Sequence, residues 1–167
     1  MHALTLLYVQ VTNEAFFDIL RTKEQLGYVV SNSAKRLYDS VGIRFLIQSE
    51  KSNDFLDDRI EQFLTGFHVS FSSNFQKELQ LMKSEDFASH KAALKNSLLE
   101  KKKTLSEECN FYWNQISTQL YEFHYNLKLV EALECITQAS LMQFISDSFE
   151  RQVSVRLGKK GEFPQSQ

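Results

Sequence analysis

Residues 20–30 have the sequence LRTKEQLGYVV, which joins a helix to a strand. Upstream, we predict helix over residues 3–25 in two pieces, because the β-branched and polar run at residues 11–13 favours a break. Gly27 is expected to end this helix, since glycine adopts the left-handed C′ conformation without steric cost. A strand is then predicted to begin at Tyr28.

The segment that follows has the alternation of a second strand. Over residues 41–47, VGIRFLI, large apolar side chains occupy every second position, so one face of the strand points to a core. The connection through residues 35–40 contains the turn formers Asp39 and Ser40. An antiparallel hairpin is therefore the simplest pairing of the two strands.

From residue 53 onward the apolar spacing becomes helical. We expect amphipathic helices capped by Asn53, Ser84, Ser106 and Thr137, followed by a short strand at residues 153–157. The stripe of the third of these helices is Cys109, Trp113, Ile116 and Leu120. This order of elements predicts an α+β fold, in which helices cover one side of an antiparallel-rich sheet. The abrupt start of the first helix suggests a domain truncated at its N-terminal edge.

Length and composition describe a folded globule. The 167 residues fit one domain at 1–158 with a polar tail at 159–167. The net charge of −2 provides no global field for nucleic acid or an anionic membrane. No apolar run is long enough for a membrane span and the start lacks the features of a signal peptide, so we expect a cytoplasmic protein. Cys109 and Cys135 lack C-x-x-C spacing and are expected to be buried thiols.

Metal and nucleophile motifs are absent from the sequence. The four histidines stand far apart, and neither H-E-x-x-H nor H-x-x-E-H occurs. We therefore expect no zinc and no other cofactor to be bound by this chain. There is also no G-x-S-x-G elbow, Walker A sequence or dinucleotide fingerprint.

Residues 21–28, RTKEQLGY, closely resemble a segment of the last domain of the insulinase-type zinc metallopeptidases, the insulysin and pitrilysin family. The resemblance continues through residues 44–51, RFLIQSEK, and residues 105–109, LSEEC. It extends to Tyr112-Trp113 and to residues 153–155, in the same order and at similar spacing. It therefore covers almost the whole chain.

The family resemblance implies a role for Arg21 and Tyr28. In that family the arginine and tyrosine of this segment reach toward a zinc site in the first domain, where they hold the substrate backbone and the developing oxyanion. Such donors suit a tetrahedral intermediate, because its charge develops where they are fixed. From periodicity alone, Arg21 could equally be a last-turn cation and Tyr28 an ordinary strand residue. Lys23 and Glu24 are expected to be solvated.

A second implied site is a polyanion contact at Lys103, within the run of lysines at residues 101–103. The resemblance matches Lys103 to a family lysine in a basic surface, whereas Thr104 replaces another. A run of this kind is more often a hydrated helix face.

The resemblance implies a domain of a larger intracellular zinc metalloendopeptidase, here called the parent. Its partners would be the N-terminal catalytic half and peptide substrates, with a homodimer left open. This chain alone is expected to be inactive, because the zinc motif is absent from it. The alternatives are an inactive scaffold or regulatory domain of the same fold, and an unrelated helical interaction domain.

Overall fold

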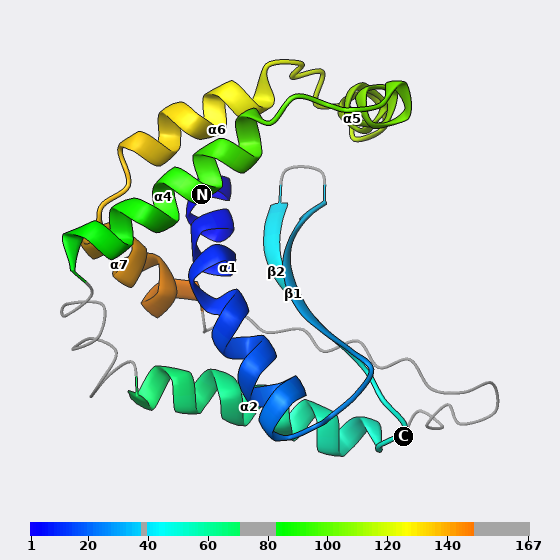
Figure 1. The fold of residues 1–167 in the computed structure, drawn as a ribbon, viewed down its shortest axis with the longest axis vertical. Coiled ribbons are helices and arrows are strands. Elements are labelled where there is room, and N and C mark those ends of the chain that lie inside the picture. The colour runs from blue at the N-terminus through cyan, green and yellow to red at the C-terminus, as the bar shows by residue number, and fades with distance from the viewer. Residues whose placement is uncertain (38–39, 71–82, 149–167) are drawn as a thin grey trace.

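The structure is a computed structural model that describes residues 1–37, 40–70 and 83–148. The predicted strand at 153–157 and the polar tail lie outside these residues. The elements follow one another as helix, hairpin and further helices (Figure 1). Their bounds are α1 His2–Phe17, the π-helix η1 Asp18–Lys23, β1 Val29–Leu37, β2 Ser40–Gln48, α2 Asn53–Ser70, α4 Ser84–Leu99, α5 Leu105–Ser117, α6 Tyr125–Glu134 and α7 Gln138–Ser148.

The predicted hairpin is confirmed. Strands β1 and β2 pair antiparallel, in a register that runs from Val29 opposite Gln48 to Leu37 opposite Ser40. Along β2, partly buried side chains alternate with exposed ones, as a strand covered on one face requires. The arrangement is α+β, as predicted.

The predicted break at residues 11–13 is wrong, because α1 runs without interruption to Phe17. Thr12 is buried, and its hydroxyl donates to the carbonyl of Tyr8 at 2.9 Å. The same hydroxyl accepts a hydrogen bond from the Asn32 side-chain amide at 2.9 Å. These bonds satisfy the polar side chain inside the helix, and the irregularity comes later, as the π-helix η1.

Two apolar clusters form the core, and α1 contributes to both. The first cluster joins α1 to α4, α6 and α7 through Ala3, Leu7, Tyr8, Phe87, Leu94, Leu129, Leu133, Ile136, Leu141 and Ile145. The second joins the end of α1 and η1 to β1 and α2 through Phe16, Leu20, Leu26, Val30, Leu56, Phe63 and Leu64. Phe45 of β2 packs against both clusters, and its ring centroid lies 5.1 Å from that of Phe16.

The helix starts agree in part with the predicted caps. Thr137 caps α7, where its hydroxyl accepts a bond at 3.2 Å from the backbone N–H three residues on. The cap of α5 is Thr104 rather than Ser106, since the Thr104 side chain accepts from a first-turn N–H. Asn53 and Ser84 are already the first residues of α2 and α4. Helix α6 was not predicted, and its N-terminus has no side-chain cap bond.

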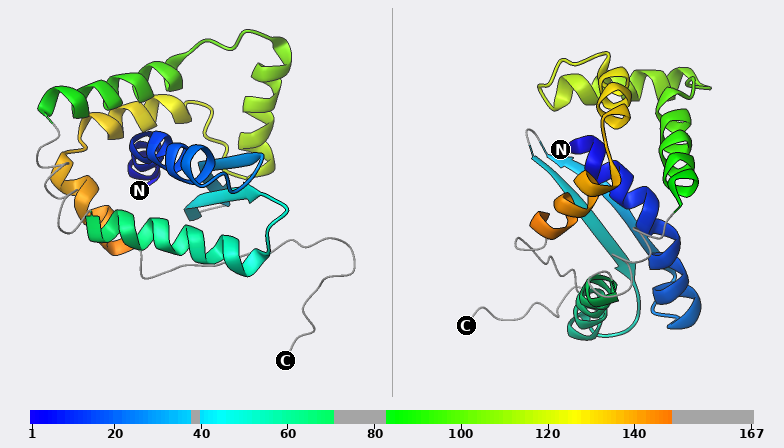
Figure 2. Two further views of the ribbon diagram at one scale, coloured as in Figure 1. Left: turned by 60° about the horizontal axis from the view of Figure 1, so that its bottom comes forward. Right: turned by 90° about the vertical axis from the view of Figure 1, so that its left-hand side faces the viewer.

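The predicted stripe of α5 does not contribute to the core of the described residues. Trp113 is 66% exposed, Ile116 is exposed, and the buried residue of this helix is Gln115. Helix α5 lies at the periphery, beside the end of the hairpin where β1 stops and β2 starts (Figures 1 and 2). The expectation of buried thiols is also wrong, since Cys109 on this helix and Cys135 after α6 are both exposed.

Candidate active site

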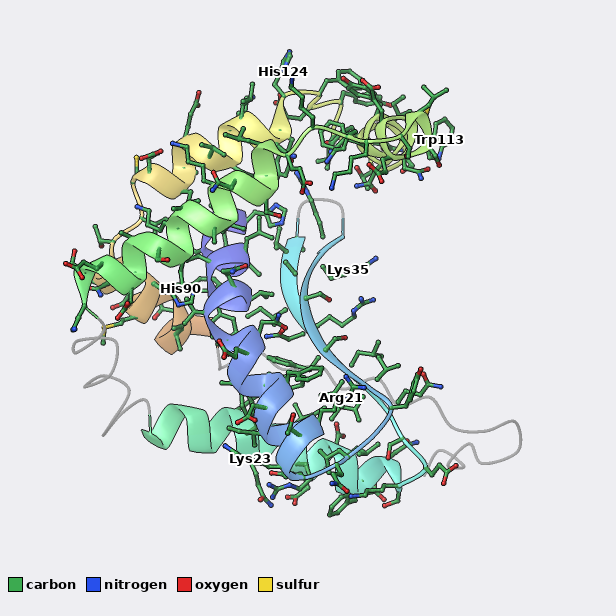
Figure 3. The ribbon with its side chains drawn as sticks, in the orientation of Figure 1. Arg21, Lys23, Lys35, His90, Trp113 and His124 are labelled. Atoms are coloured by element: carbon green, nitrogen blue, oxygen red, sulfur yellow. The ribbon has the colours of Figure 1, made fainter. Side chains whose placement is uncertain are left out.

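Arg21 lies on the π-helix that continues α1. A π-helix adds a residue to each turn and is found often at functional sites, because it displaces side chains from the regular helical register. The guanidinium carbon of Arg21 lies 4.8 Å from the centre of the Phe17 ring, four residues earlier. The Arg21 side chain is exposed, so this stacking orients a cation that remains open to solvent. Figure 3 shows Arg21 near the end of the hairpin where β1 begins.

Backbone hydrogen bonds close the turn that follows η1. The N–H of Glu24 donates to the carbonyl of Ile19, and the N–H of Leu26 donates to the carbonyl of Leu20, both at 3.0 Å. Leu26 is 2% exposed and belongs to the same apolar cluster as Leu20. These bonds and the shared apolar cluster tie Leu26, after the turn, to Leu20 on η1.

Gly27 does not end the helix in the left-handed conformation, as the sequence suggested. That conformation belongs to Gln25, whose φ is 51°. Glycine is instead required for a close approach: a Cβ on Gly27 would lie 2.1 Å from the carbonyl oxygen of Gln48. The same carbonyl accepts the N–H of Tyr28 at 3.0 Å, which joins the turn to the last residue of β2.

Tyr28 is presented to solvent at the start of β1. Tyr28 is 83% exposed, whereas Val30, two residues further along the chain, is buried in the core. Arg21 and Tyr28 therefore both leave the compact turn as exposed hydrogen-bond donors, one a guanidinium and the other a phenol. This is the arrangement that donors to an external group require.

An ion pair links this turn to α2. Arg59 donates from Nε to Glu24 Oε2 at 2.8 Å and from Nη2 to Glu24 Oε1. The side chains of Arg59 and Glu24 are 26% and 22% exposed, so Glu24 is not the solvated residue that was expected. The hydrogen bond to Glu24 raises the pKa of Arg59 above its ordinary value. No local sequence pattern indicates this contact, because its partners are separated by 35 positions.

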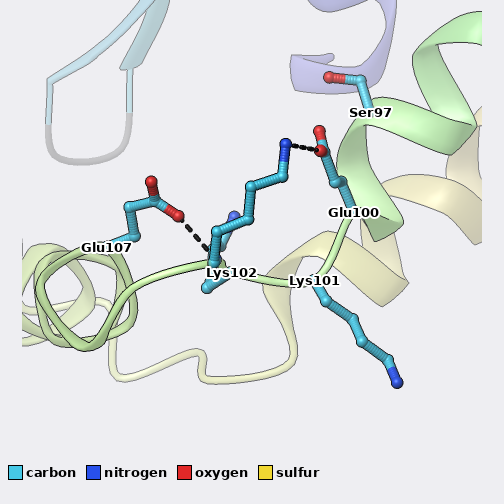
Figure 4. A pocket seen from close by; sticks show the side chains of 6 residues that line it. Ser97, Glu100, Lys101, Lys102 and Glu107 are labelled. Atoms are coloured by element: carbon cyan, nitrogen blue, oxygen red, sulfur yellow. Dashed lines mark hydrogen bonds and ion pairs between the residues drawn. The ribbon is translucent and has the colours of Figure 1, made fainter.

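Lys103 belongs to the short segment between α4 and α5. This segment passes near the other end of the hairpin (Figures 1 and 4). It lines a shallow polar depression, in which the lysines at residues 101–103 accompany Ser97, Glu100 and Glu107. The ammonium of Lys103 lies 2.8 Å from the Glu100 carboxylate, and its backbone N–H donates to Glu107 Oε2 at 2.8 Å. The hydrogen bond with Lys103 lowers the pKa of the Glu100 carboxyl. Two carboxylates thus offset much of the positive charge that a polyanion would meet.

Metal ligands do not gather in the described residues, where no group of three or more His, Cys, Asp or Glu side chains could hold an ion. His2 instead contacts Tyr125 through its Nδ1 and the phenol oxygen. Burial, followed by the charge of Arg36, lowers the pKa of His2. No described helix is long and apolar enough to cross a membrane.

Comparison with known proteins identifies the same region of related enzymes. Residues 7–113 match the family model described as PQQ synthase PqqF-like, C-terminal lobe domain 4. The chain is 37% identical to human insulin-degrading enzyme over 141 residues, which are 84% of this chain and 13% of that protein. It is 39% identical to the A-factor-processing enzyme of Saccharomyces cerevisiae over 144 residues, 86% of this chain and 13% of that one.

A solved structure of pitrilysin shares the fold. It superposes with a TM-score of 0.72 at 27% sequence identity, covering 90% of this chain and 16% of the pitrilysin chain. The chain therefore spans about one seventh of the length of the relatives that it matches.

Proposed function

The chain belongs to the insulinase family of metallopeptidases, peptidase family M16, as a domain of the C-terminal lobe, and from this we propose that it is the substrate-side domain of a larger peptide-degrading enzyme. In this proposal Arg21 and Tyr28 face the substrate. The zinc ligands belong to the N-terminal catalytic half of the parent, which is the principal partner of this domain. The family match removes the unrelated interaction domain from the alternatives.

The observation that carries the proposal is the exposure of two strong donors on one anchored turn. Arg21 is stacked on Phe17, and Tyr28 is held through its backbone to β2. A guanidinium offers several N–H groups in a fixed plane, which suits a peptide carbonyl and an oxyanion. Donors held in place before the reaction stabilise developing charge without reorganisation, and the loss of one costs about 3–4 kcal/mol of barrier in well-studied cases.

The division of labour in the parent follows from the chemistry. Zinc, when bound by the catalytic half, supplies an activated water near neutral pH. Arg21 would donate to the substrate backbone, which fixes the scissile carbonyl relative to that water. Tyr28 would donate its phenolic proton in a hydrogen bond to the oxygen on which negative charge develops. Alone, this chain would orient peptides without cleaving them.

The test is hydrolysis of a quenched fluorescent peptide by the full-length parent. We expect Arg21→Ala and Tyr28→Phe each to lower kcat/KM at least about tenfold, which corresponds to roughly 1.4 kcal/mol of transition-state stabilisation. Lys23→Ala is the matched control, because Lys23 lies on the same π-helix and pairs with Asp18 at 2.8 Å on an exposed surface. Zinc content and melting temperature are measured for every variant.

The outcomes separate the two functions that the family allows. Equal rates for wild type and both variants would make Arg21 and Tyr28 structural residues. A wild-type parent without hydrolytic activity would favour the scaffold or regulatory domain. A cytoplasmic location and a homodimer stay predictions, to be checked by fractionation and by light scattering of the parent.

A further inference from the structure

The contact between Glu24 and Arg59 differs from four other ion pairs of the described residues. Those pairs join Lys23 to Asp18, Lys95 to Glu134, Lys103 to Glu100 and Lys128 to Glu122, each with at least one side chain more than 60% exposed or both more than 40% exposed. Exposed pairs of this kind contribute little, because water and salt screen them. The Glu24–Arg59 pair is only 22% and 26% exposed and uses two parallel hydrogen bonds. Bidentate pairs fix direction as well as distance.

The guanidinium of Arg59 is held on its remaining side as well. Its Nη1 donates to the side-chain oxygen of Gln62, one turn further along α2. The Gln62 amide donates in turn to the carboxylate of Asp58 at 2.5 Å. Arg59 is therefore oriented by its own helix before it meets Glu24.

Glu24 occupies the point where the π-helix ends. It is the C-cap residue of η1, directly before the left-handed Gln25. Arg21 precedes it by one helical turn, and Tyr28 follows it by four residues. A force on the Glu24 carboxylate thus acts on the middle of the segment that carries both exposed donors.

Helix α2, which carries Arg59, packs against the turn through buried apolar side chains. Its Leu56, Phe63 and Leu64 are buried in the same cluster as Leu20 and Leu26, which flank the turn. These apolar contacts fix the distance between the turn and α2, but because they are non-directional they do not fix the orientation of the turn. The bidentate pair adds the missing direction, so it restrains rotation of the turn and sliding along the helix.

We propose that Arg59 is a positioning residue, which acts through Glu24 to hold Arg21 and Tyr28 in the geometry that the reaction needs. This inference rests on the proposed function of the two donors. Arg59 itself does not touch the substrate. Its loss should misplace donors that act on the transition state, and so should lower kcat more than it changes KM.

The experiment is a double-mutant cycle in the full-length parent, with a quenched fluorescent peptide as substrate. Arg59→Gln alone should lower kcat about tenfold with KM within about twofold of wild type, and Glu24→Gln should do the same. In the Arg21→Ala, Tyr28→Phe background, Arg59→Gln should lower kcat less than twofold further, because the groups that it positions are gone. Lys23→Ala, which breaks the exposed pair with Asp18, should leave kcat within about twofold.

Arg59→Lys keeps the charge but cannot form the bidentate contact, so an intermediate loss is expected. If Arg59→Gln does not fold, Arg59→Lys takes its place in the cycle. A tenfold loss that persists in the double-mutant background overturns the inference, since a general folding defect behaves in that way. Wild-type rates for both Arg59 variants overturn it too. If instead Arg21→Ala and Tyr28→Phe have no effect by themselves, the proposed function has failed, and this result is distinct from a failure of the pair alone.

Discussion

Gly27→Ala is expected to disrupt the attachment of the turn between Arg21 and Tyr28, the proposed active-site turn, to the hairpin. The added Cβ would lie 2.1 Å from the carbonyl oxygen and 2.9 Å from the carbonyl carbon of Gln48, and 3.2 Å from the Cβ of Ser49. The two shortest contacts are to backbone atoms, which cannot turn away as a side chain can. The first residues of β1 must therefore separate from the end of β2, and the bond from the Tyr28 N–H to Gln48 is lost.

The loss in the free energy of unfolding follows from these contacts. Forcing an extra carbon into a packed site costs about 1–3 kcal/mol, because neighbouring backbone must move. The lost backbone hydrogen bond adds roughly 1 kcal/mol. The free energy of unfolding should therefore fall by about 2–4 kcal/mol, and the melting temperature should fall by roughly 5–15 °C for a chain of this size.

Urea unfolding of the 167-residue chain, followed by circular dichroism, measures this change. Gly42→Ala is the matched control, since it lies on the same hairpin and a Cβ there meets nothing within 4 Å. We expect Gly42→Ala to be neutral or to stabilise the chain by up to about 1 kcal/mol. Equal stabilities for the two variants would refute the close approach at Gly27.

Three further changes test other parts of the structure. Phe17→Leu removes the ring beneath the Arg21 guanidinium and should lower kcat/KM of the parent about two- to fivefold. This range corresponds to about 0.5–1 kcal/mol for an exposed cation–π contact, and an unchanged kcat/KM would mean that the ring does not orient Arg21. Thr12→Val removes the acceptor of the Asn32 amide and should lower the free energy of unfolding by about 1–3 kcal/mol, whereas a loss below about 0.5 kcal/mol would contradict the buried bond. Glu100→Gln removes the carboxylate that pairs with the Lys103 ammonium, so triphosphate should bind about two- to fivefold more tightly at low salt. Calorimetry measures this affinity, and an unchanged affinity would rule out Lys103 as a polyanion contact.

Periodicity was enough to predict the hairpin and the amphipathic helices other than α6, because both patterns depend on neighbours along the chain. Thr137 could be identified as a cap for the same reason, since its partner is three residues away. The break predicted around Thr12 failed because its hydroxyl is satisfied by Asn32 of β1, a contact that no local pattern reveals. Tertiary hydrogen bonds therefore overrode a weak helix propensity.

The resemblance gave candidate residues for the site, whose role stays a prediction, but it gave no geometry. The resemblance pointed to Arg21 and Tyr28, and the structure places both as exposed donors on one turn. Gln25 could not be recognised as the left-handed residue, because Gly27 two positions later is the better candidate by conformational preference alone. Periodicity on α5 likewise described an amphipathic face around Trp113, but it could not tell whether anything covers that face.

The division of the core into two clusters has a consequence for motion. Amide hydrogen exchange reports the free energy of local opening, and separately packed regions often open as separate cooperative units. The cluster around Phe16 includes Leu20 and Leu26, which flank the turn with the donors, whereas the cluster around Leu7 is built from the first half of α1 with α4, α6 and α7. Amides near Leu26 should therefore exchange with a common opening energy below that of the first half of α1. The turn that carries Arg21 and Tyr28 should then loosen while most of the domain stays folded.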